Sequence, residues 1–107
     1  MPDRPEIVCI CGSTRFVDEM NAANRDLTFA GVIVVAPGVF LRDEDRGAGE
    51  VITDEQKTAL DALHLLKIDL ADRVLVVNPG GYVGESTSRE IAYARATGKP
   101  ISFTDPS

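Results

Sequence analysis

Residues 74–84 read VLVVNPGGYVG, and this stretch indicates the fold class. Its first four residues are apolar without interruption, which is typical of a strand covered on both faces of a sheet. The proline and glycines that follow predict a tight turn, and a helical segment runs from there to Gly98. A strand, a turn and a covering helix in this order form the repeating unit of parallel α/β folds.

The same unit recurs on both sides of this stretch. Residues 7–10 and 32–36 are apolar runs of strand length, and a further run lies at 100–103. Apolar residues recur at helical spacing from Phe16 to Gly31 and again after residues 53–56, which have the composition of a capping box. The resulting βαβαβαβ order predicts a four-stranded parallel sheet in order 2-1-3-4. We therefore expect residues 1–107 to form one α/β domain, a flavodoxin-like or Rossmann-like three-layer sandwich with helices on both faces.

The composition argues against several classes of function. Seventeen acidic residues against eleven Lys and Arg give a formal charge of -6, whereas sequence-independent binding to nucleic acids relies on clustered cations. No apolar run approaches the roughly 20 residues that span a bilayer. The first residues also lack the basic-then-apolar order of a signal peptide. We expect a cytoplasmic protein whose partners include no nucleic-acid polymer and no membrane.

Two cysteines, Cys9 and Cys11, lie two residues apart on the first predicted strand. Both side chains then point to one face, and neither is well placed to form a disulfide with the other. Together with the single, distant histidine they supply fewer ligands than a metal site needs. The sequence therefore predicts small, buried core residues, with no metal and no redox cofactor.

Ligands of parallel α/β sheets bind beyond the carboxyl ends of the strands. This rule selects residues 12–15, 36–42 and 78–90. The middle segment opens a long, charged stretch at 37–52, which is either a lid or a solvated surface connection.

The first segment places Gly12, Ser13 and Arg15 where a strand turns into a helix. Backbone amides at a helix N-terminus and a guanidinium suit a phosphate or a sugar hydroxyl. Simple capping of the helix by Ser13 or Thr14 explains the same residues equally well.

The third segment carries carboxylates. Glycines such as Gly81 let a backbone approach a ligand closely, and Glu85, Ser86 and Glu90 follow. A carboxylate at the rim of a pocket can act as a nucleophile or a general base, and Glu90 is the first candidate, with Glu85 as the second. Two structural interpretations compete. Residues 87–90 have the spacing of a capping box, and Glu85 can pair with the arginine four residues on.

His64, the only histidine, lies in the second predicted helix on one ridge with Asp61 and Lys67. Its spacing fits a structural role as well as a functional one. The same helix is apolar on two sides, because Leu65 and Ile68 do not share the stripe formed by its other leucines and alanines. One side is expected to cover the sheet and the other to contact a second copy. We therefore predict a homodimer or a larger homo-oligomer.

Three motifs in order along the chain resemble the nucleoside 2-deoxyribosyltransferase superfamily. They are Gly12-Ser13-Thr14-Arg15, Ala71-Asp72, and the segment from Gly84 to Pro100 that includes Glu90. Members of this superfamily exchange the base of a deoxynucleoside or release the base of a nucleotide to water, and both reactions use a helix glutamate to attack C1′ of the sugar. The resemblance implies cleavage or transfer at the N-glycosidic bond of a nucleoside or nucleoside 5′-monophosphate, with no cofactor.

Carried over by position, Glu90 matches the nucleophile of that superfamily. Ser13 and Arg15 fall in the loop that contacts the sugar or its phosphate, and Ser86 lies near the turn that holds a 5′-phosphate. The implied reaction is that of a retaining glycosidase, with a covalent glycosyl intermediate. Water or a second base then takes the sugar, which distinguishes a hydrolase from a transferase.

The chain departs from the superfamily in two ways: its middle portion lacks the insertions with which larger members close over the ligand, and it differs at one position of the second predicted helix. Members carry an aspartate about eight residues before the alanine-aspartate pair, where this sequence has His64. A histidine can donate a proton near neutral pH, which makes His64 the candidate acid. Residues 8–13 and 79–82 are also similar to the "lonely guy" phosphoribohydrolases, which free cytokinin bases from nucleoside monophosphates. A nucleotide-binding or sensing module without turnover is the alternative from another class.

Overall fold

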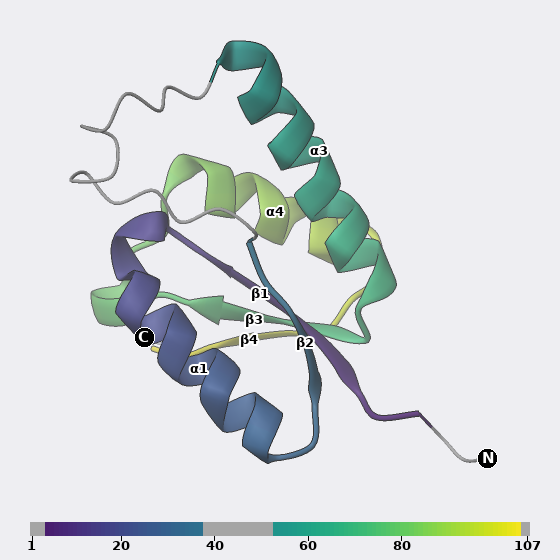
Figure 1. Cartoon of the computed structure of the whole chain (residues 1–107). Coiled ribbons are helices and arrows are strands. Elements are labelled where there is room, and N and C mark those ends of the chain that lie inside the picture. The colour runs from purple at the N-terminus through teal and green to yellow at the C-terminus, as the bar shows by residue number, and fades with distance from the viewer. Residues whose placement is uncertain (1–3, 38–52, 106–107) are drawn as a thin grey trace.

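The computed structural model describes residues 4–37 and 53–105 (Figure 1). The strands are β1 (Ile7–Gly12), β2 (Ile33–Val35), β3 (Arg73–Val77) and β4 (Ile101–Phe103). The helices are α1 (Val17–Phe29), α3 (Asp54–Leu70) and α4 (Glu85–Ala96), with short 3₁₀ turns η1 (Thr14–Phe16) and η2 (Pro79–Gly81). The loop or lid expected at 37–52 lies, from residue 38 onward, outside the described residues.

The strands pair in the order β2-β1-β3-β4, and each pair is parallel. This confirms the predicted α/β sandwich and its strand order. The central strands β1 and β3 are apolar on both sides because helices lie on both faces of the sheet. Parallel pairing also brings the carboxyl ends of the strands to one edge, which lies toward the left of Figure 1.

The sheet separates two hydrophobic cores. Helices α3 and α4 lie on one face and α1 on the other (Figure 1). Because side chains of a strand alternate between faces, Cys9 and Cys11 belong to the core under α3 and α4, whereas Ile10 packs with Met20 on the α1 side. The α3–α4 core is the larger of the two, and it contains both thiol groups of β1.

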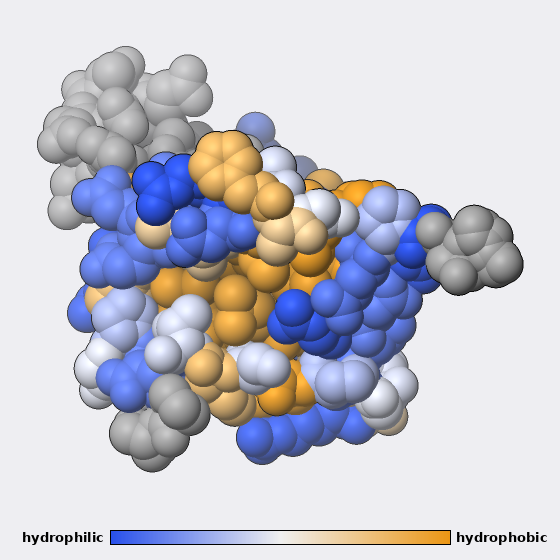
Figure 2. All heavy atoms as spheres, turned by 90° about the horizontal axis from the view of Figure 1, so that it is seen from below, coloured by the Kyte–Doolittle hydropathy of each residue, from blue (hydrophilic) through white to orange (hydrophobic). Residues whose placement is uncertain are grey.

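The α1 face is less completely covered. Its core consists of Ile10, Met20 and Val77, and the hydrophobic residues packed around these three are only partly buried. Seen from below in Figure 2, hydrophobic side chains gather at the middle of the molecule between hydrophilic ones. A single helix thus leaves the edge of this core open to solvent.

Local sequence signals begin α3 and end α1 as predicted. The hydroxyl of Thr53 accepts a hydrogen bond from the backbone N–H of Gln56, and the Gln56 side chain accepts one from the backbone N–H of Thr53. This reciprocal capping box starts α3. Helix α1 ends just before Gly31, whose φ of +87° is a conformation that glycine adopts without strain.

Helix α3 uses only one of its two apolar sides against the sheet. His64 and Ile68 are buried, whereas Leu63, Leu66 and Leu70 are exposed. The exposed leucines form the side that is left for the predicted second copy, and the oligomeric state stays a prediction. Among the described residues, no helix is both long and apolar enough to cross a membrane.

Candidate active site between α3 and α4

A cavity of about 220 Å³ lies between α3 and α4. It is somewhat smaller than the typical ligand pocket of about 300–1,000 Å³, and its size suits a sugar ring better than a whole nucleotide. Its walls are mostly hydrocarbon, contributed by side chains that also carry carboxylate, guanidinium and hydroxyl groups. The lining residues are Asp61 and Leu65 of α3 and Ser86, Arg89, Glu90 and Tyr93 of α4.

Glu90 lines this cavity from the second turn of α4, and its side chain is 15% exposed. Burial raises the pKa of its carboxyl group, and the opposing charge of His64 limits the rise. The capping-box interpretation of residues 87–90 is wrong, because α4 begins at Glu85 with Gly84 as its N-cap and Thr87 lies inside the helix. The Glu90 carboxylate therefore does not cap the helix, and it lies close to another titratable side chain instead.

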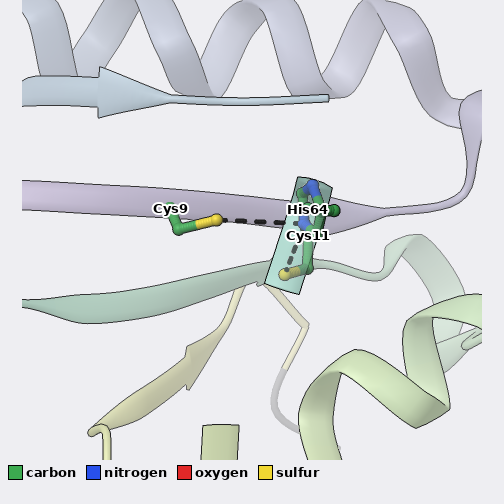
Figure 3. Close-up of side chains that lie close together, drawn as sticks. All are labelled: Cys9, Cys11 and His64. Carbon is green, nitrogen blue, oxygen red and sulfur yellow. Dashed lines mark hydrogen bonds between the residues drawn. The ribbon is translucent and has the colours of Figure 1, made fainter. Parts of the chain in front are cut away.

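That neighbour is His64, whose Nε2 lies 3.6 Å from Oε1 of Glu90. The same nitrogen lies 3.2 Å from Sγ of Cys11 and 3.8 Å from Sγ of Cys9 (Figure 3). Burial lowers the pKa of the imidazole, but the hydrogen bond with Cys9 and the charge of Glu90 outweigh it, and the pKa is raised on balance. The histidine thus joins α3 to both β1 and α4 through one ring nitrogen.

The two thiols are buried and free, as predicted. The interaction between the two neighbouring thiols lowers the pKa of Cys9 to about 6, with His64 adding to the effect, and raises the pKa of Cys11. The sequence predicts that His64 is too distant to join the two cysteines. This is wrong, because α3 packs His64 directly onto β1. The sulfur and nitrogen atoms of Cys9, Cys11 and His64 all lie within 4.8 Å of one another.

Asp61 is the cavity residue to which the sequence assigned no role. Its carboxylate accepts a hydrogen bond from Lys57 at 3.0 Å and lies 4.0 Å from Arg89 across the cavity. The available signal was its position on the same helical ridge as His64, one turn earlier.

The other end of the α3–α4 contact is held by short hydrogen bonds. The hydroxyl of Tyr93 donates to the carboxylate of Asp69 at 2.7 Å. The ammonium of Lys99 donates to the carbonyl oxygens of Asp69 at 3.1 Å and of Ala71 at 2.6 Å. These contacts fix the end of α3 to α4 and to the turn that follows it.

Ser86 and Glu85 are neighbours in sequence with different surroundings. Ser86 lines the cavity, and its hydroxyl accepts a hydrogen bond from Arg89 at 3.3 Å. The Glu85 side chain is 88% exposed and pairs with Arg89 at 2.9 Å. Glu85 thus takes part in the surface ion pair that its spacing suggested.

The loop after β1 forms a second group of candidate residues at the carboxyl edge. The hydroxyl of Ser13 accepts from the backbone N–H of Arg15 at 3.3 Å, so it caps η1. The guanidinium of Arg15 stacks over the ring of Tyr82, 4.3 Å from its centre. Neither residue lines the cavity between α3 and α4.

Gly12 and Gly81 both lie at the carboxyl edge, and the structure explains the presence of a glycine at each position in a different way. A Cβ on Gly12 would lie 2.9 Å from the carbonyl oxygen of Val77 and 3.2 Å from the sulfur of Met20, so close packing of β1 and β3 requires a glycine there. Gly81 has a φ of +82° in the turn after β3. The contacts of Gly12 and the conformation of Gly81 therefore account for both residues without a ligand.

The chain matches no protein-family model and no curated protein. Among solved structures, its fold is similar to that of a 2-deoxyribosyltransferase from the psychrotolerant bacterium Bacillus psychrosaccharolyticus, with a TM-score of 0.65. The two chains are 18% identical, and the similarity covers 91% of this chain and 70% of that one. That protein is described as a biocatalyst for the synthesis of antiviral and antitumoral nucleosides. At this identity the similarity establishes the fold.

Proposed function

We propose that this protein cleaves or transfers at the N-glycosidic bond of a nucleoside or nucleoside 5′-monophosphate, with Glu90 as the nucleophile. One observation carries the proposal. Glu90 borders a sugar-sized cavity while most of its side chain is withdrawn from water. A partly desolvated carboxylate is a stronger nucleophile than one in bulk solvent, and it can still be reached by an anomeric carbon.

The reaction follows the logic of a retaining glycosidase. A bond forms between a carboxylate oxygen of Glu90 and C1′ while the bond between C1′ and the base nitrogen breaks. The base leaves with the electron pair of that bond and takes up a proton from solvent. Water or a second base then attacks C1′ and releases Glu90. The similar fold of a 2-deoxyribosyltransferase supports this reaction class.

His64 and Asp61 take separate roles in this proposal. His64 reaches the cavity only through Glu90, so its imidazole orients that carboxylate and favours its ionised form. Asp61 is the second carboxyl group in the cavity wall, and we assign to it the hydrogen bonds to the departing base that the sequence assigned to His64. A pair of carboxyl groups that flank the scissile bond is what most glycosidases use.

The remaining polar groups are proposed to hold the substrate. Ser86 and Arg89 offer a hydroxyl and a guanidinium to the sugar inside the cavity. Ser13 and Arg15 lie at the carboxyl edge of the sheet, where phosphates bind in folds of this kind, and we assign them to a 5′-phosphate. We do not assign catalysis to Glu85, because its side chain is exposed and paired with Arg89.

The test is base release from a panel of ribo- and deoxyribonucleosides and their 5′-monophosphates, followed by chromatography. Glu90→Gln keeps the size of the side chain and removes the nucleophile, so we expect base release to fall by at least about 10³-fold. Glu85→Gln is the matched control, because it makes the same change on the same helix outside the cavity, and its rate should stay near that of the parent protein.

Three outcomes contradict the proposal. No base released from any member of the panel, with ligand binding intact, would indicate a nucleotide-binding module. Equal losses for Glu85→Gln and Glu90→Gln would remove the special role of Glu90. Full activity of a folded Glu90→Gln variant would exclude it as the nucleophile. A second base in the reaction then distinguishes transfer from hydrolysis.

A further inference from the structure

We propose that Cys9, Cys11, His64 and Glu90 form a four-coordinate binding site for one zinc ion. The sequence argued against a metal because its ligands were too few and too far apart. The fold places two thiols and an imidazole within 4.8 Å of one another and adds a carboxylate from a third element. This site stands on geometry and donor chemistry, independently of the proposed function.

The distances from His64 Nε2 to the other three donors are close to those of a tetrahedron around zinc. Zinc–sulfur bonds of about 2.3 Å and zinc–nitrogen bonds of about 2.05 Å place a sulfur and a nitrogen ligand about 3.5 Å apart. The observed distances from His64 Nε2 are 3.2 Å to Cys11 and 3.8 Å to Cys9. Nitrogen and oxygen ligands of zinc lie about 3.4 Å apart, and His64 Nε2 lies 3.6 Å from Glu90 Oε1. The three donors that lie within 4.8 Å of one another are those of Cys9, Cys11 and His64, and the Glu90 side chain moves its carboxylate toward the sulfurs to become the fourth ligand.

Each donor comes from a regular element of the fold, and those of Cys9, Cys11 and His64 already lie together. Cys9 and Cys11 are alternate residues of the central strand β1 and point to one face, His64 comes from α3, and Glu90 comes from α4. In Figure 3 both thiols are directed toward the imidazole ring. The side chains of His64 and Glu90 are 8% and 15% exposed, so the site is largely dry. Ligands fixed on strands and helices give a more precise site than ligands on loops.

The donor set favours zinc over the hard cations. Two thiolates, an imidazole and one carboxylate oxygen are borderline-soft ligands, whereas calcium and magnesium prefer six or more oxygen ligands. Glu90 also lines the α3–α4 cavity, which gives an ion a route from solvent to the two buried sulfurs. Glu90 is then the outermost ligand and closes the site behind the ion.

One consequence rests on the proposed function. A carboxylate that coordinates zinc cannot attack C1′, so the zinc-bound protein is inactive and the zinc-free protein is the active form. Zinc therefore inhibits base release, and a chelator restores it.

The experiment titrates the reduced, metal-free protein with Co²⁺, which reports its own coordination. We expect one equivalent to produce a thiolate-to-cobalt charge-transfer band in the near ultraviolet together with intense visible bands of tetrahedral cobalt. One equivalent of Zn²⁺ should remove both, and native mass spectrometry should find one zinc per chain. Absence of the charge-transfer band, or binding with octahedral spectra only, would overturn the proposal.

Variants separate this site from adventitious binding. Cys9→Ser and Cys11→Ser should each weaken the charge-transfer band and lower cobalt affinity by at least about tenfold, whereas Asp61→Asn, in the cavity wall outside the ligand set, should bind like the parent. Undiminished binding in the Cys9→Ser/Cys11→Ser double variant would refute the site. If the variants do not fold, alkylation of the parent protein decides the matter. Zinc, unlike magnesium, should protect both cysteines, and equal labelling with the two ions would exclude the site.

The two proposals fail in different ways. Cobalt binding with the expected spectrum but no base release from any substrate leaves the metal site and removes the proposed function. If the protein lacks the cobalt spectrum and a chelator does not change its base release, the proposed function stands and the metal site is excluded.

Discussion

Replacing Gly12 with alanine tests whether this glycine serves packing or the approach of a ligand. The added Cβ would lie 2.9 Å from the carbonyl oxygen of Val77 and 3.2 Å from the sulfur of Met20. The Met20 sulfur sits on a flexible side chain that can move, whereas the carbonyl belongs to the backbone of β3, which pairs with β1 at this position. Relief of the contact therefore requires the two central strands to separate by a few tenths of an ångström.

The magnitude follows from two opposing terms. Overpacking of this kind costs about 1–3 kcal/mol, and the lower backbone entropy of alanine in the unfolded chain offsets about 0.4–1 kcal/mol of it. We expect a net loss of about 1–2 kcal/mol in the free energy of unfolding. In a domain of about 100 residues this lowers Tm by about 4–16 °C. Thermal and urea unfolding followed by circular dichroism measure the change.

Ser102→Ala is the matched control, because Ser102 is exposed on β4 and already carries a Cβ. Its free energy of unfolding should change by no more than about 0.5 kcal/mol. A Tm of Gly12→Ala at or above that of the parent protein would refute the packing argument. Lost base release at an unchanged Tm would instead assign Gly12 to ligand binding.

Three further changes test other parts of the structure. Ile68→Ala removes a fully buried side chain of the α3–α4 core and should lower the free energy of unfolding in urea by about 2–5 kcal/mol. The control Ile68→Val should lower it by about 0.5–1.5 kcal/mol. Equal small losses for both variants would contradict the packing of α3. The hydrogen bonds of Asp72 with Arg4 and with a backbone N–H hold the pKa of its carboxyl below the usual range. Its contribution to stability is therefore present above the unfolded pKa of about 3.9 and is lost as pH falls through the lower folded pKa. Asp72→Asn should show a smaller fall in Tm between pH 7 and pH 3 than the parent, and parallel curves would argue against this. Leu66→Glu places a charge among the exposed leucines of α3 and should convert an oligomer to a monomer in sedimentation velocity, whereas a monomeric parent protein would disprove the predicted interface.

The fold could be predicted because each of its signals is local. The apolar runs of β1 and β3 indicate strands covered on both faces, Thr53 begins a helix by capping it, and Gly31 ends one with a positive φ. The rule that connections between parallel strands are right-handed and short then leaves few strand orders. None of these inferences needs to know which side of a helix meets the sheet.

The site, by contrast, depends on which side of helix α3 meets the sheet. Helix α3 has two apolar sides, and the longer stripe, which includes Leu63 and Leu66, is the one left exposed. The side with Leu65 and Ile68 packs on β1 instead, and the same rotation carries His64 onto the two thiols. Tertiary packing sets this rotation, so residues 53 to 55 positions apart in sequence come into contact with no local sign of it.

The unequal contacts at the two ends of the α3–α4 pair determine how the cavity between them can change. Tyr93 and Lys99 bind Asp69 and the last carbonyls of α3 at hydrogen-bonding distance. Toward the other end, Arg89 and Asp61 are 4.0 Å apart, and both side chains are about half exposed to water that screens them. Helices α3 and α4 are therefore held tightly together at the Tyr93 end and only loosely at the Asp61 end. Any widening of the cavity is therefore expected at the Asp61 end, while the hydrogen bonds of Tyr93 keep the other end closed.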